Sequence, residues 1–402
     1  MRSVLGEAGF RRLWLAALFS ETAEWILQVA LPLYVYLRTG SAASTAATMV
    51  LGLLPAVALS PVAGLLADRC DRRLVLFLVC GGQALAALPL LLVHATDLLV
   101  VVYAVMAAQA ALASVFEPAR NALVPQLVGV GNVTAANGLL GLNGNLARLA
   151  GAALGGVLLG FAGLPGVLAA YLLALALAAA LLARPFAVRA DVRAGRQALF
   201  RAWADGIAEF GRNRRLRAAG PVLALTSIAQ GMFLVLFVLF VTDSLGGGEP
   251  EVGLLRGIQA IGGLVAGAAL ATIARCAGPP ALLGWGILAL GIGSALIWNS
   301  AQVTTALGVY AALFAAVGVP SVVAGAGLQS MLQTVSEPQL SGRVLSTAFA
   351  GMAVFTAVGM LLAGTLVGAL GLPVLLNVQA GLHVAAGVLV LQARPVPAAP
   401  GR

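Results

Sequence analysis

A short, densely charged turn stands between two long apolar runs early in the chain. Five of the six residues from Asp68 to Arg73 are charged, whereas residues 41–67 and 74–93 carry no charge at all. Each run is at least as long as the roughly 20 residues that a helix needs to cross the hydrocarbon core of a bilayer. We therefore expect a tight loop at a bilayer surface that joins two membrane-spanning helices.

The composition of the whole chain extends this expectation to the rest of the sequence. Of its 402 residues, 61% are hydrophobic and only 9% are charged, and the mean hydropathy is +1.02. Soluble domains carry about 25% charged residues, so this chain has too few to cover a water-exposed surface. Long aliphatic runs recur without the alternating ten-residue pattern of a barrel strand, which predicts an all-α polytopic membrane protein.

Twelve membrane spans can be drawn along the sequence. They are 12–37, 42–67, 74–93, 98–117, 134–161, 164–183, 218–242, 253–274, 280–298, 303–325, 344–369 and 373–392. An even number of spans places both chain termini on one side of the membrane.

The distribution of arginine predicts which side that is. All 23 basic residues are Arg, and 20 of them fall in the segments on the side of the termini. Only Arg38 and Arg256 are assigned to the opposite side, and Arg148 falls inside the fifth span. Because basic residues are retained in cytoplasmic loops, we expect a multi-pass protein of the cytoplasmic (inner) membrane with both termini cytoplasmic. The positive charge is therefore attributed to topology, and we expect no nucleic-acid partner.

A basic linker divides the chain into two comparable halves. Nine arginines lie in residues 184–217, between an N-terminal bundle of six helices (1–183) and a C-terminal bundle of six (218–402). Residues 197–210 have the periodicity of an amphipathic helix lying on the headgroups, although a solvated hinge remains an alternative. Weak similarity between the halves suits the paired repeats of secondary transporters.

Charged side chains inside the first span are the main functional candidates. Glu21 and Glu24 are three residues apart and share a helix face with Gln28. A charge at this depth costs about 2.5–3.5 kcal/mol even on permissive scales, so the pair must meet water or a cation. Arg148 is the candidate cation, which leaves one carboxyl free to carry a proton. The alternative is a structural Glu–Arg clamp between the first and fifth spans.

Other polar residues within spans are weaker candidates for a cavity lining. These residues are Asn143, Asn145, Gln230 and His383, each of which could instead form a hydrogen bond between helices. The sequence contains no metal-ligand spacing, phosphate-binding loop or nucleophilic triad. We therefore expect no metal, no cofactor and no enzymatic activity.

The charged turn also resembles a known signature. The pattern formed by Gly64, Asp68, Arg69, Arg72 and Arg73 is similar to the loop motif of the major facilitator superfamily of transporters, with Asp71 where glycine is usual. The resemblance implies that this turn serves gating and topology, and that the first and fifth spans are neighbours within a fold of two six-helix bundles.

Further segments resemble the drug:proton antiporter branch of that superfamily, which includes macrolide and siderophore exporters. They are residues 10–14, 118–127, 206–217 and 341–344. Gly151, Gly155 and Gly156 are similar to the glycine motif of the antiporters, without its proline. Small residues at this spacing let helices pack closely, and generic Gly–Ala packing would look the same.

These observations predict a secondary transporter that exports amphipathic small molecules in exchange for protons. The expected partners are a small-molecule substrate, protons and the lipid bilayer, and we expect a monomer. Proton- or cation-coupled uptake of a metabolite is the first alternative, and a non-transporting receptor on the same fold is the second. The small number of charged residues in the spans favours export of a hydrophobic compound.

Overall fold

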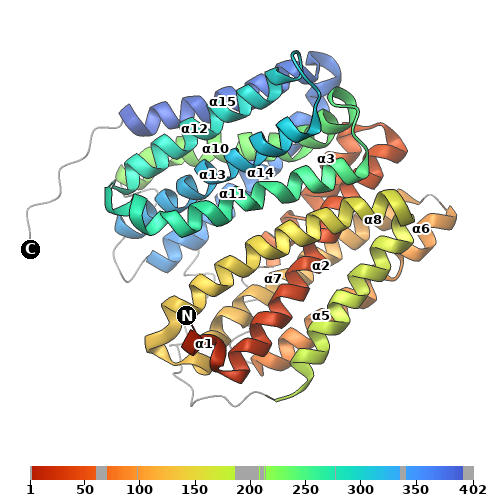
Figure 1. The fold of residues 1–402 in the computed structure, drawn as a ribbon, viewed down its shortest axis with the longest axis vertical. Helices are drawn as coiled ribbons and strands as arrows, with labels where there is room; N and C mark the ends of the chain where they lie inside the picture. Colours follow the sequence, from red (N-terminus) through yellow and green to blue (C-terminus); the bar gives the residue numbers. More distant parts are fainter. Residues whose placement is uncertain are drawn as a thin grey trace, which may run out of the picture.

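The computed structural model describes residues 2–59, 70–96, 98–185, 208, 212, 214–276, 278–335 and 341–392 (Figure 1). Within these ranges all regular structure is helical. The helices are α1 (Arg2–Gly6), α2 (Ala8–Thr39), α3 (Ala42–Leu51), α5 (Arg72–Ala87), α6 (Leu90–Thr96), α7 (Leu99–Val128), α8 (Val133–Ala183), α10 (Arg214–Leu239), α11 (Glu249–Cys276), α12 (Pro279–Ser300), α13 (Leu307–Val335), α14 (Ser341–Leu370) and α15 (Leu372–Gln392). A 3₁₀ turn, η1 (Val130–Asn132), precedes α8, and a π-helical turn, η2 (Phe240–Ser244), follows α10.

The described helices account for twelve membrane spans. Nine are long and apolar enough to cross a membrane. One of these nine, α8, has 51 residues and would measure about 76 Å if straight, more than twice the core of a bilayer. It contains two spans, because the backbone of Gly163 adopts a φ of 63° and bends the chain ahead of Pro165. Because α8 contains two spans, the nine helices contribute ten. Helices α2 and α11 are also long enough to cross the membrane, although each carries charged residues, and they bring the total to twelve.

Some predicted boundaries were wrong. The fourth span was predicted to end at residue 117, but α7 continues to Val128 and keeps Arg120 within the helix. The charges at Glu117 and Arg120 marked a membrane surface in the sequence, whereas in the fold Arg120 meets a carboxylate on another helix. The tenth span begins at Leu307 rather than residue 303 and runs on to Val335.

The described part of the charged turn is built as a helix start. The Asp71 side chain accepts hydrogen bonds from the backbone N–H groups of Arg73 and Leu74, at 2.9 and 3.2 Å. Its φ of −58° shows that this position needs no glycine. The Arg73 guanidinium donates to the carbonyl of Ala183 at 2.6 Å, which satisfies the C-terminal end of α8.

Several residues named from the sequence lie outside the described ranges. Among the residues of the turn, these are Gly64, Asp68 and Arg69. Most of the linker from 184 to 217, including nearly all of its predicted amphipathic helix, also lies outside them.

The helices form two groups that meet at one end. Helices α2, α5, α7 and α8 pack on one another, as do α10 to α15, and α8 contacts α11 while α3 contacts α14 across the groups. In Figure 1, α8 and α11 lie close together toward the right and diverge toward the left, where α1 begins and α15 ends. We call the end where α2 begins and α15 ends the termini end, and the opposite end the far end.

Small residues permit the contacts at the far end. A Cβ atom added to Gly253 of α11 would lie 2.7 Å from the Cα of Gly156 in α8. A Cβ atom on Gly364 of α14 would lie 2.6 Å from the Cβ of Ala46 in α3. We call the span Ala42–Leu59, which contains α3 and the residues that follow it, the α3 segment. The Tyr36 hydroxyl of α2 also donates to Asp243 of η2 at 2.6 Å. Backbones that approach this closely gain dispersion contacts, which drive helix association in lipid.

Substituting Gly253 by Ala should therefore lower the stability of this packing. The added methyl group would meet backbone atoms of α8 that cannot move aside, and overpacking of this kind costs about 1–3 kcal/mol. We expect a lower midpoint of thermal unfolding for the purified protein in detergent. Gly138→Ala is the matched control, because nothing lies within 4 Å of a Cβ there. Equal midpoints for the two variants would contradict the close approach of α8 and α11.

Candidate functional site

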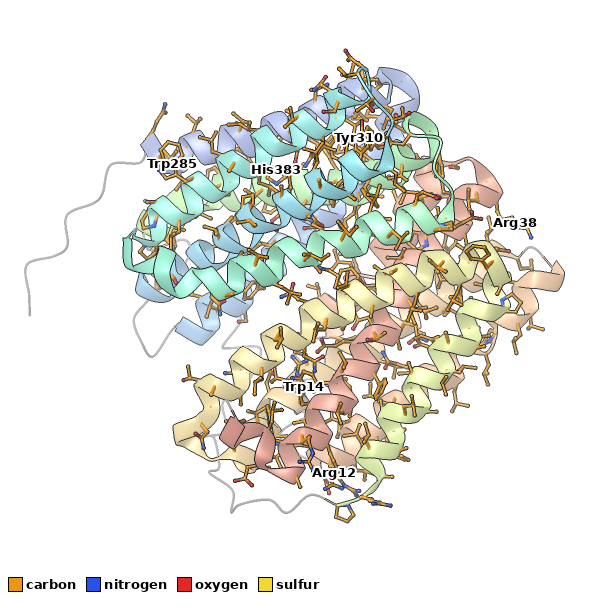
Figure 2. The ribbon with its side chains drawn as sticks, in the orientation of Figure 1. Arg12, Trp14, Arg38, Trp285, Tyr310 and His383 are labelled. Carbon is orange, nitrogen blue, oxygen red and sulfur yellow. The ribbon has the colours of Figure 1, made fainter. Side chains whose placement is uncertain are left out.

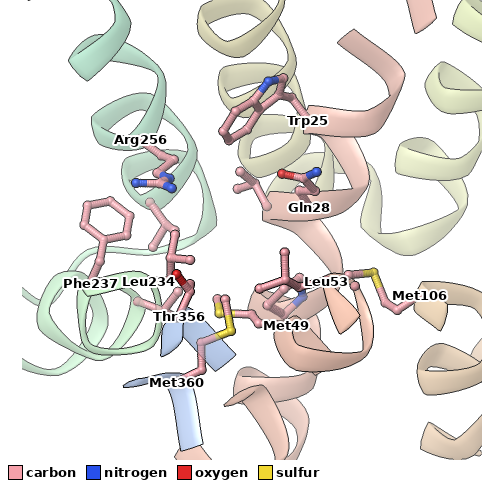
Figure 3. Close-up of a pocket in the computed structure, with 15 residues that line it drawn as sticks. Trp25, Gln28, Met49, Leu53, Met106, Leu234, Phe237, Arg256, Thr356 and Met360 are labelled. Carbon is pink, nitrogen blue, oxygen red and sulfur yellow. The ribbon is translucent and has the colours of Figure 1, made fainter. Parts of the chain in front are cut away.

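A cavity of about 180 Å³ lies between the two helix groups. Six helical segments line it, namely α2, the α3 segment and α7 from the first group, and α10, α11 and α14 from the second. Figure 3 shows side chains from both groups facing one another across this space. Its wall is mainly apolar and includes Met49, Met106 and Met360, whose flexible thioether chains adapt to differently shaped partners. The cavity is suited to an apolar body of variable shape.

Arg256 is the cation of this cavity. Its guanidinium carbon lies 5.1 Å from the ring centre of Phe233, 5.8 Å from that of Trp25 and 5.9 Å from that of Phe237. Gln259 accepts a hydrogen bond from it at 3.4 Å, and no carboxylate among the described residues lies within ion-pair distance. A cation–π contact with one aromatic face stabilises a guanidinium by about 0.5–2 kcal/mol. Removing an ion from water costs several kcal/mol, so these contacts offset only part of that cost. The arginine distribution predicts that Arg256 lies at a membrane surface, but the structure places it on the cavity wall (Figure 3).

The predicted pairing of Arg148 with a glutamate of α2 is wrong. Glu21 instead forms an ion pair with Arg120 of α7, and the two side chains are only 18% and 11% exposed. Arg148 donates to Asn145 on its own helix at 3.2 Å, and its buried Nε has no hydrogen-bond partner among the described residues. Arg120 lies beyond the predicted end of the fourth span at residue 117, so the sequence pattern does not indicate it as a partner for Glu21.

Glu24 lies in a different environment from Glu21. Its carboxylate accepts a hydrogen bond from Gln28 at 2.8 Å, and no described arginine pairs with it. It borders a second cavity of about 30 Å³, which is roughly the volume of one water molecule. The other polar side chains on this wall are Gln28, Gln83, Gln109 and Tyr171. Gln28 also lines the larger cavity and so lies between the two.

A hydrogen-bonded chain runs along the wall of the small cavity. The Tyr171 hydroxyl donates to Gln109 at 2.7 Å, and Gln109 donates to the backbone carbonyl of Gln83 at 2.8 Å. The Oε1 atom of Gln83 is buried without a described partner. A site this small and this polar can hold a water molecule, which would satisfy that oxygen.

The remaining polar candidates take structural positions. Asn143 is fully buried and donates to the backbone carbonyl of Trp14, which joins α8 to α2. Gln230 and His383 do not line either of the two cavities described here. Figure 2 shows His383 within the second helix group. It is 3% exposed and lies against Gln379, which accepts a hydrogen bond from Trp298 at 3.0 Å. A lone polar residue in a span was therefore a poor guide to the cavity.

The glycine motif of α8 positions the cavity residues of α2. A Cβ on Gly151 would lie 2.6 Å from the Cβ of Trp25, and one on Gly155 would lie 2.7 Å from the carbonyl oxygen of Ile26. Gly156 faces Gly253 on α11. The three glycines thus seat α8 between α2 and α11, next to Trp25.

Comparison with known proteins shows one consistent relationship. The sequence model of a family described as transmembrane secretion effector matches residues 3–400. The multidrug efflux pump Tap of Mycobacterium tuberculosis is 29% identical over 374 residues, which cover 89% of this chain and 86% of that protein. The MFS-type transporter YfiS of Bacillus subtilis is 29% identical over 154 residues, covering 38% of this chain and 36% of that protein.

Solved structures share the fold. A bacterial homologue of the iron transporter ferroportin in its inward-facing state superposes with a TM-score of 0.69 and 19% identity, covering 95% of this chain and 98% of that one. The outward-facing state of a bacterial ferroportin homologue, with the same coverage and identity, gives a TM-score of 0.61.

Removing one partner of the Glu21–Arg120 pair should destabilise the protein strongly. Arg120→Gln would leave a largely buried carboxylate without its cation, and breaking a buried pair in this way costs about 3–5 kcal/mol. The double variant Glu21→Gln/Arg120→Gln should recover most of this loss, which thermal unfolding in detergent would measure. Glu117→Gln is the control, because its carboxylate is 73% exposed and lies 3.7 Å from Arg120. A double variant no more stable than Arg120→Gln would argue against the pair.

Proposed function

Because the chain belongs to the transmembrane secretion effector family of major facilitator transporters, we propose that it exports amphipathic small molecules across the membrane in exchange for protons. The observation that carries this proposal is the mainly apolar cavity walled by both helix groups. A site shared between two groups can be exposed first at one end and then at the other as the groups rock against each other. The similarity to a multidrug efflux pump supports the direction of transport.

The size of the cavity indicates which part of a substrate it holds. Apolar cavities of about 150 Å³ accept benzene, so 180 Å³ accommodates about one aromatic ring. Drug-sized ligands occupy pockets of about 300–1,000 Å³. In this state the cavity would hold the apolar body of a small substrate, or one end of a larger one.

The packing of the two helix groups supports a state that opens toward the cytoplasm. The contacts of Tyr36, Gly253 and Gly364 between the groups all lie toward the far end. The arginine distribution favours a cytoplasmic termini end, so the far end would face outward. The higher TM-score with an inward-facing homologue agrees with this assignment. Such a state would take up substrate from the cytoplasm.

Glu24 is the group we propose as the proton carrier. Glu21 is held by Arg120, whereas Glu24 has only Gln28 as a described partner. A charged carboxylate at this depth is costly, so protonation lets it stay within the helices without a cation. The water-sized cavity beside Glu24 would supply a route for the proton. Gln28, which borders both cavities, would connect the protonation state of Glu24 to the substrate cavity.

Replacing Glu24 by Gln should uncouple transport from protons. Proteoliposomes would be assayed for movement of ethidium, Nile red and anilinonaphthalene sulfonate, which are cationic, neutral and anionic amphipathic dyes. We expect the wild-type protein to accumulate at least one dye against its gradient when a pH gradient is imposed. The Glu24→Gln variant should accumulate the dye at least tenfold less than the wild type. It should still exchange dye inside the vesicle for dye outside, because its cavity is intact.

The matched control for this experiment is Glu117→Gln, since Glu117 is an exposed carboxylate on the neighbouring helix. It should transport like the wild type. Undiminished pH-driven accumulation in Glu24→Gln would remove Glu24 as the carrier. A wild-type protein that moves none of the three dyes would overturn the proposal of amphipathic export.

A further inference from the structure

Two partly buried arginines lie on facing turns beside the cavity. Gly257, next to Arg256 on α11, packs on Leu149, next to Arg148 on α8, so closely that a Cβ on Gly257 would lie 2.8 Å from the carbonyl oxygen of Leu149. Arg148 also reaches toward α11, because its Nη2 would lie 3.4 Å from a Cβ on Gly263. Both side chains thus lie at the interface of α8 and α11, close enough for their positive charges to repel each other.

Neither arginine is neutralised by the residues that the structure describes. Arg256 meets aromatic rings and the Gln259 amide, and Arg148 meets the Asn145 amide. The nearest carboxylates on α2 are directed elsewhere, Glu21 to Arg120 and Glu24 to Gln28. Two cations that repel each other and lack a counter-ion raise the energy of the empty site. An anion entering the cavity would relieve this repulsion, so the site complements negative charge.

We propose, building on the export function above, that the transported molecule is an amphipathic acid. Its apolar body would occupy the cavity lined by methionines, and its carboxylate or other acidic group would face Arg256, which lines the same cavity (Figure 3). A guanidinium matches planar oxyanions through two parallel N–H donors, which makes Arg well suited to this role. Arg148 strengthens the positive potential from the neighbouring helix without lining the cavity itself.

A purely structural role for Arg256 makes a different prediction. If stacking on Trp25, Phe233 and Phe237 only held α2, α10 and α11 together, removing the guanidinium would lower stability without changing which ligand charge is preferred. The charge preference of the ligand therefore separates the two roles, and it can be measured in the wild-type protein.

The test uses three ligands of one shape and different charge. The compounds are 3-phenylpropionate, 3-phenylpropanamide and 3-phenylpropylamine, titrated calorimetrically at pH 7 into the purified full chain in detergent, with empty micelles as the blank. A charge-assisted hydrogen bond corresponds to a factor of about ten or more in affinity. We expect the wild-type protein to bind the acid at least about tenfold more tightly than the amide, and the amine most weakly.

Variants assign the preference to Arg256. Arg256→Gln should lower the affinity for the acid to the affinity for the amide. The affinity for the amide itself should change less than about twofold, because the apolar wall of the cavity is unchanged. Arg256→Lys should keep part of the preference, since it retains the charge but not the paired donors. Arg38→Gln is the matched control, because Arg38 also stacks on a ring, that of Tyr34, but does not line the cavity. It should bind as the wild type does.

Each result decides the proposal. It is overturned if the wild-type protein shows no preference for the acid, if Arg256→Gln keeps that preference, or if Arg38→Gln loses it as well. If Arg256→Gln does not fold, the wild-type series and Arg256→Lys decide. Export of ethidium and Nile red with no preference for the acid would refute this inference and leave the export function standing. A preference for the acid that depends on Arg256, with no dye transported, would refute the export function alone.

Discussion

Every charge buried among these helices must be satisfied by other protein groups or by trapped water, because the surrounding lipid offers no polar partner. The structure meets this demand in three ways. Glu21 and Arg120 neutralise each other across α2 and α7. Glu24 lies beside a polar, water-sized cavity, where taking up a proton would remove its charge. Arg256 is covered by aromatic faces that attract a cation without neutralising it. The candidate site contains the two of these charged groups that have no ion-pair partner among the described residues, Glu24 and Arg256.

Small residues determine where the two helix groups touch, and therefore where the cavity remains. Gly156 and Gly253 bring α8 against α11 toward the far end, and Gly364 does the same for α14 against the α3 segment. Side chains cannot be inserted at these points without moving backbone. Next to these contacts the residues are larger, and Trp25, Met49 and Met360 line a space instead of a packed interface. Close contacts at the far end and a cavity beside them suit a rocking motion between two groups.

Sequence reasoning identified the class of protein and most spans, because hydropathy and arginine distribution are local properties imposed by the bilayer. It also placed Glu24 and Gln28 on one helix face, since i,i+4 spacing is local too. It chose the wrong partner for Glu21, because the pairing depends on which helix lies opposite and at what height. Arg120 was ranked as a surface residue for the same reason. The signal for Arg256 was present as an arginine in an apolar run, but its position near the predicted start of a span made it resemble a surface charge.

The sequence by itself determined that this chain is an all-helical membrane protein of twelve spans, because the solvent imposes length and composition on each span separately. Even the charged turn from Asp68 to Arg73 could be assigned to a membrane surface on composition alone. Only the tertiary structure decided which charges are neutralised and which face a cavity. That outcome depends on contacts between residues far apart in the chain, such as Glu21 with Arg120 and Arg256 with Trp25. Such contacts follow from how the helices pack, and no single segment encodes that packing.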